Sequence, residues 1–179
     1  MSYDAVVYDL DGTLVELPVD WGAVDREVRD VVAKRTEVDP AGRDAWDLLP
    51  VAERAGERAA VEEILSRHER ASAPEARRLA LAEEMAGEKR PVGVCSLNCE
   101  AAVRAALERH DLADSAASIV GRDTVKTEKP DPEPLLRVVE ALGVSPERTL
   151  FVGDSERDER TAERAGTGFA YVAERANRS

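Results

Sequence analysis

Residues 4–13 of the chain read DAVVYDLDGT. The first five form a short, apolar and β-branched run, which predicts a buried strand over residues 4–8. Asp9 and Asp11 follow directly, and Gly12 lets the backbone turn and approach a ligand closely. A buried strand that ends on two acids predicts carboxylates gathered at one edge of a sheet.

The second half of the chain alternates short apolar runs with helical patterns. Strands are predicted over residues 91–95, 118–120, 149–152 and 168–172, and helices over residues 100–108, 132–142 and 159–165. This alternation is typical of an α/β fold with a mainly parallel sheet flanked by helices, which is the expected fold class. A chain of 179 residues is long enough for one such domain with a modest insertion.

Residues 16–88 interrupt the pattern with charged, helical sequence between the first two strands. We expect an α/β core made of residues 1–15 and 89–179 and a small, all-helical insertion of residues 16–88. Within it, the sequence predicts one long helix from Val51 to His68 and another that opens at Pro74 and contains Leu79 and Leu81. A turn or small hairpin is expected over residues 12–19. Trp21 and Trp46 are expected in the core of the insertion, and Arg43, Arg54 and Arg58 on solvated helix faces.

The charge balance excludes several classes of partner. There are 37 acidic and 25 basic residues, which gives a net charge of −12, and only four of the basic residues are lysines. This field disfavours nucleic acid and anionic membranes, and no apolar run reaches the ~18 residues of a membrane span. Abundant acids with few lysines predict a halophilic protein. The two cysteines and the lack of a basic leader predict a cytoplasmic one.

Polar side chains follow four of the predicted strands. They are Asp9 and Asp11, Ser96 and Asn98, Lys126 and Lys129, and Asp154, Ser155 and Asp158. Ligands of open α/β sheets bind beyond the carboxyl ends of the strands, so these groups are expected to converge. The set suits phosphoryl transfer: Asp9 and Asp154 could hold Mg²⁺, Asp9 could attack phosphorus, Asp11 could move the proton, and Ser96 could bind a phosphoryl oxygen.

These segments resemble the four motifs of the haloacid dehalogenase-like hydrolases. Residues 9–13 (Asp-Leu-Asp-Gly-Thr) resemble the first motif, Ser96 after its apolar strand the second, residues 129–132 (Lys-Pro-Asp-Pro) the third, and residues 151–155 with Asp158 the fourth. The resemblance implies a Rossmann-like core, and it implies that residues 16–88 are a helical cap.

The resemblance also implies a role for each residue. It makes Asp9 the nucleophile and a Mg²⁺ ligand, and Asp11 the general acid and base, with its backbone carbonyl on the metal. The phosphate-binding set comprises Ser96, Lys129, Gly12 and Asn98, and the metal set comprises Asp9, Asp11, Asp154 and Asp158. Leu97 stands where many relatives have an asparagine, so Asn98 is the candidate for that amide. Lys126 is expected at the surface.

The expected function is a Mg²⁺-dependent phosphatase of the phosphoglycolate phosphatase-like branch. Its substrate would be a small phosphorylated metabolite, such as phosphoglycolate or a sugar phosphate. A phosphomutase of the same superfamily is the first alternative, since it would use the same residues. A non-catalytic receiver-like protein and a degenerate binding protein are further alternatives. The sequence leaves open whether the protein is a monomer or a homodimer.

Overall fold

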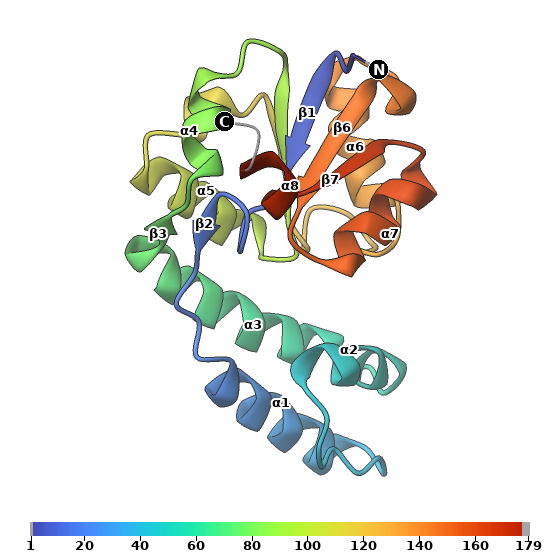
Figure 1. The fold of residues 1–179 in the computed structure, drawn as a ribbon. Coiled ribbons are helices and arrows are strands. Elements are labelled where there is room, and N and C mark those ends of the chain that lie inside the picture. Colours follow the sequence, from blue (N-terminus) through green and yellow to red (C-terminus); the bar gives the residue numbers. More distant parts are fainter. Residues whose placement is uncertain (1, 177–179) are drawn as a thin grey trace.

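A five-stranded parallel sheet forms the centre of the molecule. The computed structural model describes residues 2–176. The strands run in the order β5-β4-β1-β6-β7, and every neighbouring pair is parallel. They are β1 (Ala5–Tyr8), β4 (Val92–Cys95), β5 (Ser118–Val120), β6 (Thr149–Gly153) and β7 (Gly168–Tyr171). The predicted fold class, an α/β fold with a parallel sheet, is therefore confirmed (Figure 1).

Helices cover both faces of this sheet, because alternate residues of its buried strands point to opposite sides. Val6 and Tyr8 belong to a cluster with residues of α4 (Leu81–Gly87) and α5 (Glu100–Arg109). Val7 belongs to the other cluster, with residues of α6 (Glu133–Leu142) and α7 (Glu156–Ala165). A short helix, α8 (Val172–Ala176), follows β7. The sheet is buried in a three-layer core, which leaves its carboxyl edge for ligands.

Three helices form a separate bundle over that edge: α1 (Trp21–Arg35), α2 (Ala45–Arg54) and α3 (Arg58–Ser72). We refer to α1–α3 as the cap. Their apolar faces enclose a cluster of their own that includes Val28, Leu48 and Leu65. In Figure 1 the arrowhead of β1 points towards the cap. The cap therefore has its own core and lies where strand-end residues would meet a substrate.

Two short strands join the cap to the core. β2 (Val15–Glu16) pairs antiparallel with β3 (Arg77–Arg78), so the outgoing and returning chains lie side by side. Beyond β3, Leu81 and Met85 of α4 pack in the same cluster as β1 rather than in the cap cluster. The unit boundaries proposed from the sequence, at residues 16 and 88, stay a prediction.

Two local predictions in the insertion are wrong. Residues 51–68 are not one helix, since α2 ends at Arg54 and α3 begins at Arg58. Gly56 lies between them with a positive φ of 76°, a conformation that ends helices and favours glycine. Pro74 opens only a single 3₁₀ turn, and Leu79 lies outside α4. The predicted turn is present at residues 12–14, and the strand that follows it, β2, pairs with the distant β3 rather than within a local hairpin.

Among residues 2–176, no helix combines the length and the apolar character that crossing a bilayer requires.

Candidate active site

Asp9 is the central residue of the site, directly after β1. Its side chain is buried, and its Oδ1 accepts a hydrogen bond of 2.7 Å from Lys129 Nζ. Burial raises the pKa of Asp9, and the ammonium of Lys129 acts in the opposite direction. The pKa of Lys129 is itself raised, since the attraction of Asp9 and Asp158 outweighs the effect of its burial. Lys129 is therefore a cation held against the candidate nucleophile.

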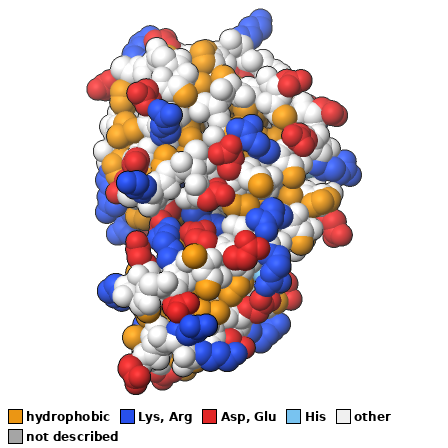
Figure 2. All heavy atoms as spheres, turned by 180° about the vertical axis from the view of Figure 1, so that it is seen from behind, with side chains coloured by type: hydrophobic (Ala, Val, Ile, Leu, Met, Phe, Trp, Pro, Cys, Tyr) orange, Lys and Arg blue, Asp and Glu red, His pale blue; other side chains and the backbone are white. Residues whose placement is uncertain are grey.

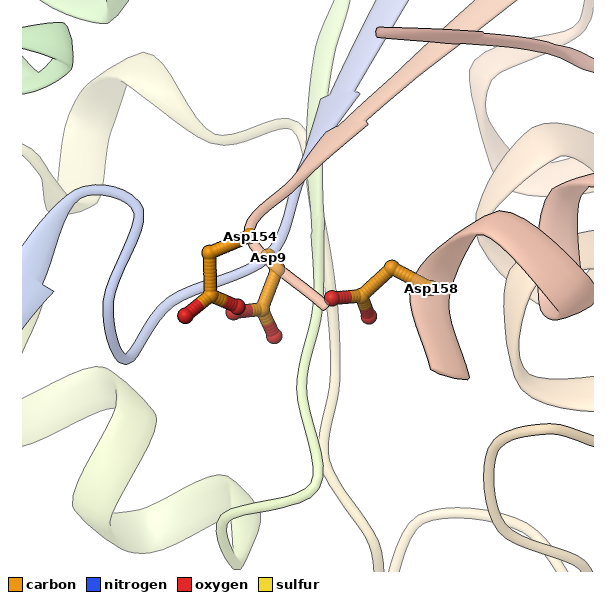
Figure 3. A group of neighbouring side chains, drawn as sticks. All are labelled: Asp9, Asp154 and Asp158. Carbon is orange, nitrogen blue, oxygen red and sulfur yellow. The ribbon is translucent and has the colours of Figure 1, made fainter. Parts of the chain in front are cut away.

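Asp154 and Asp158 complete an acidic cluster around Asp9. One carboxylate oxygen from each of the three lies within 4.8 Å of the others. Asp9 and Asp154 follow neighbouring parallel strands, and Asp158 points to them from α7 (Figure 3). Their shared location follows from the sheet order, because β1 lies next to β6.

Asp158 is held by contacts on both of its oxygens. Its Oδ1 accepts from Lys129 Nζ, and its Oδ2 accepts from Ser155 Oγ at 2.6 Å. Ser155 in turn accepts from the backbone N–H of Asp158, so the two residues form a capping box that begins α7. This arrangement fixes Asp158 as a support for Lys129 and for the acidic cluster.

The cluster has the donor chemistry of a Mg²⁺ site. It offers only carboxylate oxygens, and Mg²⁺ prefers oxygen ligands in proteins. The glycine of the first motif makes room for it: a Cβ on Gly12 would lie 2.1 Å from Asp154 Oδ2. Gly12 also has a φ of 79°, which disfavours any other residue. The residues present therefore fit a divalent cation.

Asp11 lies beside this cluster, and its carboxylate is absent from the three-acid group found among residues 2–176. Its Oδ1 accepts a hydrogen bond of 2.8 Å from the backbone N–H of Leu17. Burial raises the pKa of Asp11, and the bond from Leu17 opposes the change. A carboxyl group with a raised pKa at the edge of a cavity is suited to donate and accept protons.

Ser96 and Asn98 face the same cavity from the loop after β4. Both are buried, and Ser96 Oγ donates to Asn98 Oδ1 at 3.0 Å. The backbone N–H of Asn98 donates to Ser96 Oγ at 3.1 Å. Leu97 lies between them and also lines the cavity. Lys126 is exposed, outside this group, whereas Lys129 is buried in it.

The cavity has a volume of about 240 Å³ and combines residues of the core and of the cap. Trp21 and Trp46 pack against the cap cluster, as expected from the sequence, but both also line this cavity. Arg157, from the first turn of α7, is a third lining residue that sequence analysis missed. Its position inside the fourth motif, between Asp154 and Asp158, was the signal available.

Sequence analysis also missed a buried charge network between cap and core. Arg122 Nη1 donates to Glu69 Oε1 of α3 at 2.6 Å and to the carbonyl of Leu97 at 2.6 Å. Arg122 Nε donates to Glu62 at 2.7 Å, and the second oxygen of Glu69 accepts from the backbone N–H of Cys99. The loop that carries Ser96 and Asn98 is therefore tied to the cap by charged hydrogen bonds. Figure 2 shows acidic and basic side chains gathered along the boundary between core and cap.

Curated proteins similar to this chain include a phosphatase. The chain is 40% identical over 95 residues to the phosphoglycolate phosphatase of Rhodospirillum rubrum, a match that covers 53% of this chain and 39% of that protein. The chain thus aligns with well under half the length of that relative.

Solved structures share the whole architecture. A haloacid dehalogenase superfamily hydrolase of subfamily IA from Geobacter sulfurreducens superposes with a TM-score of 0.59 at 24% identity, over 94% of this chain and 88% of that one. CbbY from Rhodobacter sphaeroides, in complex with phosphate, gives a TM-score of 0.66 at 20% identity, over 94% and 85% of the two chains. These similarities confirm the fold, including the helical cap.

The family model of the haloacid dehalogenase-like hydrolases matches residues 59–172, which is more than half of the chain. That range includes the strand-end residues after β4 and β6 and the lysine loop between them. The chain belongs to the haloacid dehalogenase-like hydrolases.

Proposed function

We propose that this protein is a Mg²⁺-dependent phosphatase that hydrolyses a small phosphorylated metabolite through an aspartyl-phosphate on Asp9. The observation that carries the proposal is the environment of Asp9. It is a buried carboxylate at a strand end, 2.7 Å from a lysine ammonium and surrounded by two further acids. Family membership and the similarity to a curated phosphoglycolate phosphatase support the same reading.

Asp9 and Asp154 would hold the metal through their carboxylates, and Asp11 through its backbone carbonyl. Asp158 would orient them while it remains bonded to Lys129 and Ser155. When bound, Mg²⁺ supplies positive charge that offsets the negative charge of the phosphoryl oxygens.

Asp9 acts as the nucleophile in the first half of the reaction. A carboxylate oxygen of Asp9 bonds to phosphorus while the bond from phosphorus to the ester oxygen of the substrate breaks. Asp11, in its protonated form, gives its proton to the departing oxygen and releases an alcohol, and the rise of its pKa on burial suits it to that role. Lys129 and Ser96 line the cavity and would bind phosphoryl oxygens.

Asp11 acts in the opposite sense in the second half. As a carboxylate, it takes a proton from a water molecule, whose oxygen bonds to phosphorus while the phosphorus–Asp9 bond breaks. Inorganic phosphate leaves, and both aspartates return to their starting states. Trp21 and Trp46 cover the cavity from the cap side, which limits the access of bulk water.

A cavity of about 240 Å³ favours a substrate of a few carbon atoms. The curated relative is named for phosphoglycolate, so phosphoglycolate is the first compound to test. Release of free phosphate, rather than formation of an isomeric sugar phosphate, would separate the phosphatase from the phosphomutase alternative.

The test is a phosphate-release assay over a panel of phosphorylated metabolites, with and without Mg²⁺, on the wild type and on Asp9→Asn. We expect release that requires Mg²⁺ and is lost in the variant. Asp30→Asn makes the same chemical change at an exposed position on α1 and should match the wild type. Mg²⁺-dependent turnover by Asp9→Asn would overturn the nucleophile assignment. Lack of phosphate release from the whole panel would count against the proposed activity.

A further inference from the structure

Arg157 belongs to the core, but its side chain reaches the cap. It lies in the first turn of α7, and its guanidinium carbon is 5.7 Å from the centroid of the Trp46 ring of α2. It lines the same cavity as Asp9 and Lys129. A guanidinium therefore faces the substrate cavity at the boundary between core and cap.

The neighbouring arginines differ from Arg157 in how their charges are compensated. Arg122 is paired with Glu62 and Glu69, and Arg58 with three glutamates. Arg122 and Arg157 each have the guanidinium carbon 5.7 Å from the centroid of the Trp46 ring, but within residues 2–176 no carboxylate lies at ion-pair distance from Arg157. Stacking on an aromatic ring leaves the planar edge of N–H donors available to an anion.

The surroundings of Arg157 would strengthen its attraction for an anion. Trp46 packs against Trp21, with ring centroids 5.8 Å apart, and the two indoles form an apolar wall of the cavity. Charges attract one another more strongly beside apolar walls than in water.

The cavity therefore holds two cationic side chains with different surroundings. Lys129 is bonded to Asp9 and Asp158, beside the position of the reacting phosphoryl group. Arg157 lines the same cavity and is stacked on Trp46 of the cap. A substrate that filled about 240 Å³ would contact both.

We propose that Arg157, stacked on Trp46, forms an anion subsite that selects phosphomonoesters carrying a second negative group, a carboxylate or another phosphate. The inference rests on the proposed phosphatase function and specifies its substrate class. Arg157 is a specificity residue in this proposal. It binds the part of the substrate that does not react, so its loss raises KM and leaves kcat close to the wild-type value.

The experiment compares three substrates of equal carbon length. Phosphoglycolate carries a carboxylate, ethylene glycol bisphosphate carries a second phosphate, and ethyl phosphate carries neither. Arg157→Gln should raise KM for at least one of the two charged substrates by about 10- to 100-fold, the value of a hydrogen bond between charged groups. KM for ethyl phosphate should stay within about twofold. The charged substrate with the larger effect identifies the group that the subsite accepts.

Two further variants serve as controls. Arg157→Lys keeps the charge without the planar fork, so it should recover part of the lost affinity. Arg160→Gln removes an exposed arginine from the same helix and should change no KM value. An equal rise in KM for all three substrates in Arg157→Gln would mean that Arg157 only holds the cap against the core, and it would overturn the subsite.

A binding measurement keeps the inference testable if no substrate is turned over. Titration calorimetry with the Asp9→Asn protein in Mg²⁺ would compare the affinities for phosphoglycolate, ethylene glycol bisphosphate and ethyl phosphate. A preference of at least about tenfold for a charged compound, lost on adding Arg157→Gln, would support the subsite even if the phosphatase proposal failed. Equal affinities for all three compounds would refute it.

Discussion

Replacing Arg122 with methionine would test the charge network that connects the cap to the loop after β4. The side chains of Arg122 and Glu69 are both fully buried. Without Arg122, the Glu69 carboxylate would keep only the Cys99 N–H as a hydrogen-bond donor among the contacts described above. Removing one partner of a buried ion pair costs about 3–5 kcal/mol, because an uncompensated charge is left in the interior.

This cost can be converted into a melting temperature. A chain of 179 residues has an unfolding entropy of about 0.38 kcal/mol/K, at ~2.1 cal/mol/K per residue. Arg122→Met should therefore lower Tm by about 8–13 °C. The matched control is Arg58→Met, whose partner Glu128 also joins cap to core. That pair is 26% and 25% exposed, so its loss should cost no more than ~1 kcal/mol.

A double-mutant cycle in urea would separate the pair from its surroundings. Glu69→Leu alone would leave the buried Arg122 guanidinium with Glu62 as its remaining carboxylate partner among the contacts described above, whereas the combined Arg122→Met and Glu69→Leu variant removes both buried charges together. We expect the stability loss of the double variant to be smaller than the sum of the losses of the two single variants, by about 0.5–3 kcal/mol. If Arg122→Met cost no more than Arg58→Met, or if the two single changes were additive, the stabilising role assigned to the buried pair would be refuted.

Four further predictions concern the site, the linker before β4 and the surface. Asp11→Asn should lower kcat by about 10²–10⁴ and leave Mg²⁺ affinity intact by calorimetry, and an unchanged rate would remove Asp11 from proton transfer. Gly12→Ala should weaken Mg²⁺ binding, since its Cβ would lie 2.1 Å from Asp154 Oδ2, and normal affinity would contradict the close packing. Arg90 lowers the pKa of Glu88 from 4.5 to about 2, so this pair should stabilise the fold above pH 4.5 and lose that effect as the pH falls to 2. The Tm difference between wild type and Glu88→Gln should therefore shrink over that range, and a constant difference would argue against the pair. Tm should rise from low to molar KCl, because salt screens the repulsion within a chain of net charge −12, and a flat response would contradict the halophilic interpretation.

The sheet and the acidic cluster were predictable from the sequence because both depend on local patterns. Each strand of the core is a short apolar run, and the residues after β1 and β6 carry their chemistry at fixed offsets. Parallel neighbours end at the same edge, so Asp9 and Asp154 had to be close once β1 and β6 were adjacent. The position of each motif directly after a predicted strand is therefore enough to predict that its polar residues meet at one edge of the sheet.

The cap contacts were not predictable in the same way. Glu69 and Arg122 are 53 residues apart in the sequence. Taken alone, each one is expected to be a charged side chain exposed to solvent. Helical periodicity shows that Trp46 belongs to an apolar face, but it does not show how α2 is rotated over the cavity. The break between α2 and α3 did have a local signal in Gly56, which a pattern dominated by charged and alanine residues obscured.

The antiparallel pairing of β2 with β3 also bears on how the chain folds. Val6 pairs with Val92 in the sheet, so the pairing of β1 with β4 must close a loop of more than 80 residues. The entropy of loop closure rises only slowly, by about 0.6 kcal/mol for each doubling of length. Pairing Glu16 with Arg77 removes most of the intervening residues from that loop, because the chain leaves and re-enters the core at neighbouring points. Insertions or deletions in the turns between α1, α2 and α3 should therefore leave the closure of the sheet almost unaffected in rate and in stability. Because β2 and β3 close this junction, the sheet can form in the same way whatever the length of the segment inserted between them.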